Sequence, residues 1–380
     1  MSALTAPAVD RAAGPRLVVD LAAVAANTRL FAERATGELM AVVKADGFGH
    51  GAVDVARTTL AHGATRLGVT SIDEALALRA ERVAAPVLSW LNPVDADFRA
   101  GVAAGVEVAV PSRRHLEALT SQTPGARVHL HLDTGMARDG AAPSAWGDLC
   151  RAARRAERAG QLSVVGLMGH LPDADQPTEP SNARGRLRFA WGLEQARAAG
   201  LRPRDRHLAA TAATLTDPLS HHTMSRVGAG LVGIDPSRTT TLRPALTLTA
   251  PLVEVRRVRA GTPVGYGHAW TAPAVTDLGL VPLGYADGLP RTASGLAEVL
   301  VRGQRRPLVG RISMDMAVVD LGETRAAVGD AVTVFGPGDH GEPTVREWAD
   351  WSDTIEHEIV TGLGARLRRT VRSTALRSVR

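Results

Sequence analysis

Short apolar runs alternate with longer segments of helical periodicity from residue 38 to about residue 233. Eight runs have the length and the Val and Leu content of strands. They span residues 39–43, 67–71, 86–90, 107–110, 128–133, 164–170, 207–211 and 227–232. Eight strand–helix repeats in about 195 residues favour a (β/α)8 barrel over the competing layout, an open doubly wound sheet.

The pattern changes near Thr240, where prolines begin to separate short runs rich in Val and Leu. Examples are residues 246–258, 278–286 and 317–322, and they predict a mainly β second domain. We therefore expect an α/β protein with an N-terminal barrel over 1–239 and a C-terminal β domain over 240–380. Residues 1–15 are featureless and could pack with the second domain.

The positive charge of the chain is concentrated at its C-terminal end. The formal net charge is +5, but residues 365–380 hold six arginines and no acid, so the rest sums to 5 − 6 = −1. This distribution leaves no basic stripe for nucleic acid across the fold, and we expect the tail to be a solvated or loosely packed end and not a binding arm. Cys150 is the only cysteine, which excludes an internal disulfide framework.

The sequence also argues against a secreted, a membrane-spanning and a metal-binding protein. Asp10 and Arg11 interrupt the place where a signal peptide needs its apolar core. No run reaches the roughly 18 apolar residues that span a bilayer, so a cytoplasmic protein is expected. The histidines do not form HExxH or another metal-binding spacing, and no metal is expected; those considered are His131, His221, His222 and His357.

Lysine occurs once in this sequence. Of 44 Lys and Arg residues, only Lys44 is lysine, which leaves 44 − 1 = 43 arginines. Arginine replaces lysine as a surface cation, but it does not lose its proton at usable pH and cannot serve as an amine nucleophile. Lys44 is therefore the first candidate for covalent chemistry.

Several reactive or cationic residues follow the predicted barrel strands, where the active sites of such barrels lie. They are Lys44, Arg138, His170, Thr211, Arg226 and Gly228. An amine, two guanidinium groups and a small-residue turn fit a cofactor with an aldehyde, a phosphate and an aromatic ring. Pyridoxal 5′-phosphate has all three and binds lysine as a Schiff base. Its phosphate would meet backbone N–H groups near Thr211, Gly228 and Ala229.

Residues 228–233, GAGLVG, also fit the G-x-G-x-x-G fingerprint of dinucleotide-binding proteins. That fingerprint must open a helix after a strand. Here Pro236 and Pro244 stand where the helix would run, so the nicotinamide interpretation fails.

Taken together, six motifs resemble those of alanine racemases, a family of fold-type III pyridoxal-phosphate enzymes. They lie at 42–51, 132–140, 226–237, 264–272, 282–291 and 309–322, in the family's order and spacing. The resemblance runs from near Val19 to near Ile355. It implies a two-base racemase that interconverts L- and D-alanine for cell-wall precursors and works as a head-to-tail homodimer.

The resemblance also implies a role for each matching residue. Lys44 would hold the cofactor and act as base on one face of the substrate, and Tyr266 from the partner subunit would act on the other. Arg226 would face the pyridine nitrogen, and His170 would link Arg226 to Tyr266. Arg138 would reach the cofactor and the substrate carboxylate. The remaining implied contacts are Thr211, Gly228, Ala229 and His357 for the cofactor, and Met314, Asp315 and Tyr285 for the substrate and its entrance.

Three departures from the family pattern leave the substrate open. Phe48 and His357 stand where the family usually has tyrosines, and His131 stands where many members have a modified lysine that positions Arg138. Thr211 replaces a serine and keeps the hydroxyl. The alternatives are a racemase of serine or of a specialised amino acid, or an aldolase on the same scaffold. A non-catalytic cofactor carrier is more remote, because such proteins lack the second domain and Tyr266.

Overall fold

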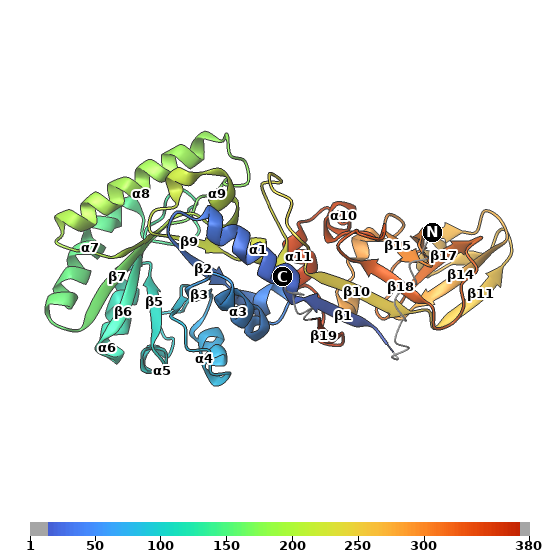
Figure 1. Cartoon of the computed structure of the whole chain (residues 1–380), viewed down its shortest axis with the longest axis horizontal. Coiled ribbons are helices and arrows are strands. Elements are labelled where there is room, and N and C mark those ends of the chain that lie inside the picture. The colour runs from blue at the N-terminus through green and yellow to red at the C-terminus, as the bar shows by residue number, and fades with distance from the viewer. Residues whose placement is uncertain (1–13, 373–380) are drawn as a thin grey trace, which may run out of the picture. The chain divides into compact units, whose positions relative to one another are not determined.

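The computed structural model describes residues 14–372 and divides the chain into two compact units (Figure 1). One unit, the barrel, comprises Ala23–Arg243. The other, the β unit, joins residues 14–22 to residues 244–372. The chain thus leaves the β unit after its first strand, forms the barrel, and returns.

Within the described residues, the barrel contains eight parallel strands in the order β8-β7-β6-β5-β4-β3-β2-β9, which confirms the predicted fold. Between β8 and β9, irregular backbone hydrogen bonds continue the wall: the N–H of Thr223 donates to Arg206 O at 3.1 Å, and that of Arg226 to Ala209 O at 3.0 Å. The strands are β2 (Glu38–Val42), β3 (Arg66–Val69), β4 (Val87–Ser89), β5 (Val106–Val110), β6 (Ala126–His131), β7 (Leu162–Met168), β8 (Asp205–His207) and β9 (Met224–Val227).

Helices connect these strands and cover them through apolar faces of helical spacing. In α7 (Pro143–Arg158), Trp146, Leu149, Cys150 and Ala153 are all buried. Burial raises the pKa of the Cys150 thiol to about 12, which makes it an unreactive core residue. The other helices of the unit are α1 (Leu21–Arg34), α2 (Lys44–Phe48), α3 (Ala52–Ala61), α4 (Ile72–Ala80), α5 (Phe98–Ala103), α6 (Arg113–Gln122), α8 (Pro180–Ala198) and α9 (Thr211–Thr216).

The eighth barrel strand lies earlier than predicted. Residues 227–232 were expected as a strand, but β9 ends at Val227 and a short 3-10 turn, η2, covers Ala229–Val232. The pairing of β2 with β9 ends at Ala41 and Val227. Apolar composition made the segment strand-like, whereas its glycines let the chain turn, and the turn ends on Gly233 with φ +97°. The start of η2 thereby lies directly after the strand end.

The β unit confirms the predicted mainly β second domain. Its described residues form a sheet in the order β11-β14-β17-β16-β15-β18-β10-β1-β19, in which only β1 and β19 pair in parallel, and a β12-β13 ribbon. The later strands are β10 (Leu246–Pro251), β11 (Glu254–Val258), β12 (Pro263–Val264), β13 (Trp270–Thr271), β14 (Thr276–Val281), β15 (Glu298–Val301), β16 (Gln304–Val309), β17 (Ala317–Gly322) and β18 (Ala331–Phe335). Two helices, α10 (Val345–Trp351) and α11 (Glu356–Thr361), follow.

Both ends of the described chain enter this sheet, which differs from two expectations. β1 (Arg16–Asp20) pairs with β10 and not with the barrel, because Leu17 and Val19 are buried in the β unit. The domain division therefore falls at Ala22 and Arg243 and not at residue 239. β19 (Arg368–Arg372) pairs with β1, so the backbone of this part of the tail is built into the sheet and is not loosely packed, although its arginine side chains are exposed. Residues 373–380 lie outside the described residues.

Across residues 14–372, no helix is long and apolar enough to cross a membrane.

Candidate active site

Lys44 stands at the start of a left-handed turn that follows β2. Residues 45–48 all have positive φ, from +51° to +64°, a conformation that costs non-glycine residues about 1–2 kcal/mol each. Two carboxylates hold the turn: Glu74 Oε1 accepts the N–H of Ala45 at 2.7 Å, and Asp46 Oδ1 accepts the first N–H of α3 at 2.9 Å. The position of the lysine is therefore fixed by its neighbours and not by a regular helix.

The amine of Lys44 is held in a place that disfavours its charge. Burial lowers its pKa, and the positive charge of Arg138 lowers it further, while Glu74 acts in the opposite direction. A lysine with a lowered pKa supplies a neutral amine more readily, which suits it to act as nucleophile or base.

Arg226, on β9, is buried in the barrel and donates to five acceptors. Its NH1 group contacts His207 O at 2.8 Å and His207 Nδ1 at 3.0 Å. Its NH2 group contacts Gly169 O at 2.7 Å, and His170 Nδ1 and Leu208 O at 3.3 Å. Burial lowers its pKa to about 10, so it remains a cation at neutral pH. The Nε–H makes no hydrogen bond within residues 14–372 and is available to a ligand.

His170 follows β7 and shares the site with three cations. Burial, and then the charges of Arg226, Arg138 and Lys44 among others, lower its pKa to about 3, so the ring is neutral. Its backbone is fixed by Thr134, whose hydroxyl accepts the N–H of His170 at 3.1 Å. Lys44, Arg138 and Arg226 are therefore all close enough to influence the charge of His170, and Arg226 contacts its ring directly.

The turn after β9 gathers backbone N–H groups at one hydroxyl. Thr211 Oγ1 accepts the N–H of Gly228 at 3.3 Å and that of Gly230 at 3.4 Å, and Ala229 lies between them. A Cβ at Gly228 would lie 2.7 Å from the ring of Phe48, so only glycine fits. A turn of small residues with adjacent N–H groups and a hydroxyl, directly after a barrel strand, suits a phosphate group.

Arg138 is exposed, and its loop is fixed by neighbours of opposite charge. Asp133 Oδ1 accepts three successive N–H groups, those of Gly135, Met136 and Ala137. His131 Nδ1 lies 3.3 Å from Asp139 Oδ2, an electrostatic contact without hydrogen-bond alignment. The loop backbone therefore positions Arg138, with His131 touching the residue next to it.

The predicted residues of the β unit lie on exposed loops. Tyr266, Tyr285 and Met314 are 69%, 42% and 53% exposed. The loops of Tyr285 and Met314 are joined through their backbones, because the N–H of Tyr285 donates to Ser313 O at 3.0 Å and that of Ala286 to Met314 O at 2.9 Å. His357 lies half-buried on α11.

Arg366 ties these two loops together, a role that the sequence did not single out. Its guanidinium binds both oxygens of Asp287 at 3.0 Å and Asp315 Oδ1 at 2.7 Å. Arg366 is therefore held by ion pairs, although its side chain is half-exposed. No local signal marked it, because Arg366 lies far beyond the last family motif, which ends at Gly322.

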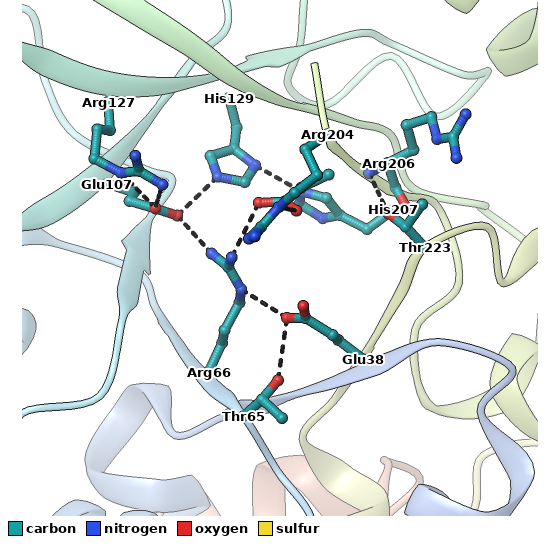
Figure 2. Close-up of polar contacts among 11 residues, drawn as sticks. Glu38, Thr65, Arg66, Glu107, Arg127, His129, Arg204, Arg206, His207 and Thr223 are labelled. Atoms are coloured by element: carbon teal, nitrogen blue, oxygen red, sulfur yellow. Dashed lines mark hydrogen bonds and ion pairs between the residues drawn. The ribbon is translucent and has the colours of Figure 1, made fainter. Parts of the chain in front are cut away.

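The barrel interior holds a second set of residues that sequence reasoning missed (Figure 2). Arg66 forms ion pairs with Glu38 at 2.9 Å, Glu107 at 3.1 Å and Asp205 at 3.3 Å. Potential metal-ligand atoms of Glu107, His129 and Asp205 lie within 4.8 Å of one another, but the guanidinium of Arg66 already neutralises both carboxylates. This cluster is an ion-pair network. Its sequence signal was the presence of charged residues inside apolar strand runs.

The site residues predicted in the barrel lie at strand ends of its (β/α)8 fold, where Lys44 has a lowered pKa, the turn at Gly228 suits phosphate and Arg226 offers a buried N–H donor. Such a site defines a pyridoxal-phosphate enzyme. Models of the N-terminal and C-terminal domains of alanine racemase match residues 19–236 and 245–371. The chain belongs to the alanine racemase family and is a pyridoxal-phosphate-dependent amino-acid isomerase.

Individual relatives agree over nearly the whole chain. An alanine racemase of Thermobifida fusca is 44% identical, over 92% of this chain and 96% of its own. The structure of an alanine racemase from D-cycloserine-producing Streptomyces lavendulae has a TM-score of 0.93 and 38% identity, and covers 96% of this chain and 98% of its own. An alanine racemase of Bartonella henselae, solved with covalently bound pyridoxal phosphate, has a TM-score of 0.86, 26% identity, and 95% and 100% coverage.

Proposed function

We propose that this enzyme interconverts L- and D-alanine with two bases, Lys44 and Tyr266, the second supplied by another copy of the chain. The observation that carries the proposal is the single lysine of the sequence, held on a strained turn at a strand end with a lowered pKa. No other side chain of the barrel can form a Schiff base through an amine.

The barrel residues fit the cofactor through separate groups. Lys44 would bind its aldehyde carbon, Arg226 would donate Nε–H to its ring nitrogen, and the turn at Thr211, Gly228 and Ala229 would hold its phosphate. When bound, pyridoxal phosphate withdraws electrons from the substrate Cα and makes its proton acidic. Arg226 would donate a hydrogen bond without transferring its proton, because its pKa of about 10 is far above that of a pyridine. Lys44 Nζ would then remove or return the proton at Cα on its own face.

Tyr266 would exchange the proton on the opposite face of Cα. Its exposure, together with that of Tyr285 and Met314, supports a homodimer in which these loops complete the site of the partner. Asp315 and Met314 would then border the substrate carboxylate near Arg138, and Tyr285 would narrow the entrance. His357 would donate a hydrogen bond in place of the tyrosine usual at its position, which Phe48 does not do at its own. The proposal extends to a cytoplasmic enzyme that makes D-alanine for cell-wall precursors, which rests on the family alone.

Proton exchange tests the activity and its substrate together. The purified holoenzyme is incubated with a panel of amino acids in D2O, and deuterium incorporation at Cα is followed by NMR. We expect exchange and racemisation of alanine. Exchange of serine without alanine would overturn the substrate and keep the chemistry. Failure to develop visible absorbance on addition of pyridoxal phosphate would overturn the whole proposal.

Subunit mixing tests the shared site. Lys44→Ala and Tyr266→Phe subunits, each inactive alone, are unfolded, mixed in equal amounts and refolded. If each site takes one residue from each chain, random pairing restores about a quarter of the wild-type activity. Activity no higher than that of the separate variants would show that both bases come from one chain.

A further inference from the structure

A line of buried polar side chains continues from Arg226 across the barrel interior. Beyond the bond from Arg226 to His207, His207 Nε2 lies 2.8 Å from His129 Nδ1, and His129 Nε2 lies 2.9 Å from Glu107 Oε2. Figure 2 shows the part of this line from His207 to Glu107. All four side chains are at most 5% exposed, so water does not offer them alternative partners.

The protons on this line have only one consistent arrangement. A guanidinium can only donate, so His207 Nδ1 accepts from Arg226 and carries no proton. The proton of His207 is then on Nε2, which donates to His129 Nδ1. His129 in turn is protonated on Nε2, which donates to Glu107. Burial and the charge of Arg226 lower the pKa of His207 well below its usual value, in agreement with a neutral ring.

The far end of the line is fixed as an acceptor. Although burial raises it, the pKa of Glu107 is lowered to about 2 by the hydrogen bond from His129 and by Arg127 and Arg66. Arg66 contacts Glu107 Oε2 at 3.1 Å and Arg127 contacts Oε1 at 2.8 Å. Glu107 is therefore a carboxylate wherever the protein is folded at ordinary pH.

We propose that His207, His129 and Glu107 are positioning residues that hold Arg226 through this fixed order of protons. The two histidines keep an acceptor facing NH1, so the guanidinium keeps its orientation and presents Nε–H to the cofactor ring nitrogen. The inference rests on the proposed function, in which Arg226 faces that nitrogen. If His207 moved its proton to Nδ1, two donors would face each other and Arg226 would have to shift.

Two variants of His129 separate the relay from simple packing. His129→Asn keeps an acceptor oxygen near the place of Nδ1, whereas His129→Gln keeps a donor nitrogen near that of Nε2. Histidine-labelled holoenzyme is examined by 15N NMR, together with the 15N shift of labelled cofactor, the cofactor dissociation constant and the melting temperature. In the wild type we expect His207 to be protonated on Nε2 from about pH 5.5 to 9.

The Gln variant is expected to populate Nδ1–H of His207, move the ring-nitrogen shift and weaken cofactor binding about tenfold, while the Asn variant keeps the wild-type tautomer and shift. Equal behaviour of the two variants, or an Nδ1–H signal of His207 in the wild type, would overturn the relay. The 15N signals of the histidines do not depend on racemase activity. If only the proposed function were wrong, these signals would be as expected, but pyridoxal phosphate would not bind.

Discussion

The barrel and the β unit prepare their predicted site residues in different ways. In the barrel the side chains themselves are fixed: Arg226 is buried and donates to five acceptors, and His170 is neutral beside it. In the β unit Arg366 and backbone hydrogen bonds fix the loops of Tyr285 and Met314, but the side chains of Tyr266 and Tyr285 are exposed. The difference teaches that buried side chains such as Arg226 and His170 are ordered within one chain, whereas, within the described residues, the tyrosines of the β unit have no such packing around them.

Replacing Lys44 should have the largest effect on racemisation, because it removes the only lysine amine of the barrel. For both Lys44→Ala and Lys44→Arg we expect racemisation to fall by at least about 10³-fold. The Arg variant keeps the charge, so it separates nucleophilicity from electrostatics. Activity is measured by Cα deuterium exchange. Activity of Lys44→Arg within tenfold of the wild type would contradict the assignment.

Tyr266→Phe tests the exposed side of the comparison. Loss of one acid–base group should slow proton removal from one enantiomer about 10²- to 10⁴-fold and affect the other much less. Cofactor affinity should not change, because the barrel residues that would hold the cofactor are untouched. Initial exchange rates of L- and D-alanine are compared, with Tyr285→Phe as the control. Equal slowing for both enantiomers would count against a second base.

The buried network should make the barrel the acid-sensitive part of the molecule. The pKa of Glu107 falls from its usual 4.5 to about 2 on folding, so its contribution of about 3 kcal/mol is present above pH 4.5 and is lost as the pH falls towards 2. Urea unfolding of Glu107→Gln should show a flatter dependence on pH in this window. Asp148→Asn, an exposed surface control, should keep the wild-type slope. Parallel slopes for Glu107→Gln and the wild type would refute the assignment.

Arg366→Ala should affect the β-unit loops alone. Without its bonds to Asp287 and Asp315 the two loops lose their link, and we expect KM to rise about 3- to 10-fold with a smaller change in kcat. The guanidinium is half-exposed, so the loss should shrink at high salt. Arg302→Ala, which removes an exposed pair with Asp330, is the control. A kcat loss with unchanged KM would argue against a role in the substrate site.

Phe48→Tyr should have the smallest effect. The ring already packs against Gly228, and the added hydroxyl could contact a phosphate at the same turn. We expect the cofactor to bind roughly threefold more tightly, from one further hydrogen bond. Equilibrium dialysis against pyridoxal phosphate measures the change, with the melting temperature as a check on packing. Weaker binding at an unchanged melting temperature would show that the hydroxyl does not reach the phosphate.

The features that could be predicted from the sequence were those that depend on short segments of the chain. The apolar runs located the barrel strands, and Lys44 stood out because lysine occurs once. The last strand was misplaced because residues 228–232 are apolar, whereas their glycines turn the chain. β1 was not predicted, and its residues fell within the expected barrel range, because its partner β10 begins at Leu246, far along the chain.

The contacts of charged side chains were not predictable in the same way. Arg366 meets Asp287 across a sequence separation of 79 residues, and His129 meets His207 across 78. Nothing in the local pattern marks one of 43 arginines for such a pairing. Only the closed barrel and the completed sheet bring these partners together.

The insertion of the barrel between β1 and β10 sets an order of events during synthesis. β1 leaves the ribosome first, but its neighbour β10 follows only after Asp20–Leu246, a delay of roughly 10–45 s at ordinary rates of translation. Its other neighbour, β19, lies close to the end of the chain. For that interval β1 is an unpaired strand with apolar Leu17 and Val19, open to wrong partners while the barrel folds. The barrel can mature early, whereas the β unit is completed only when its first and last strands meet.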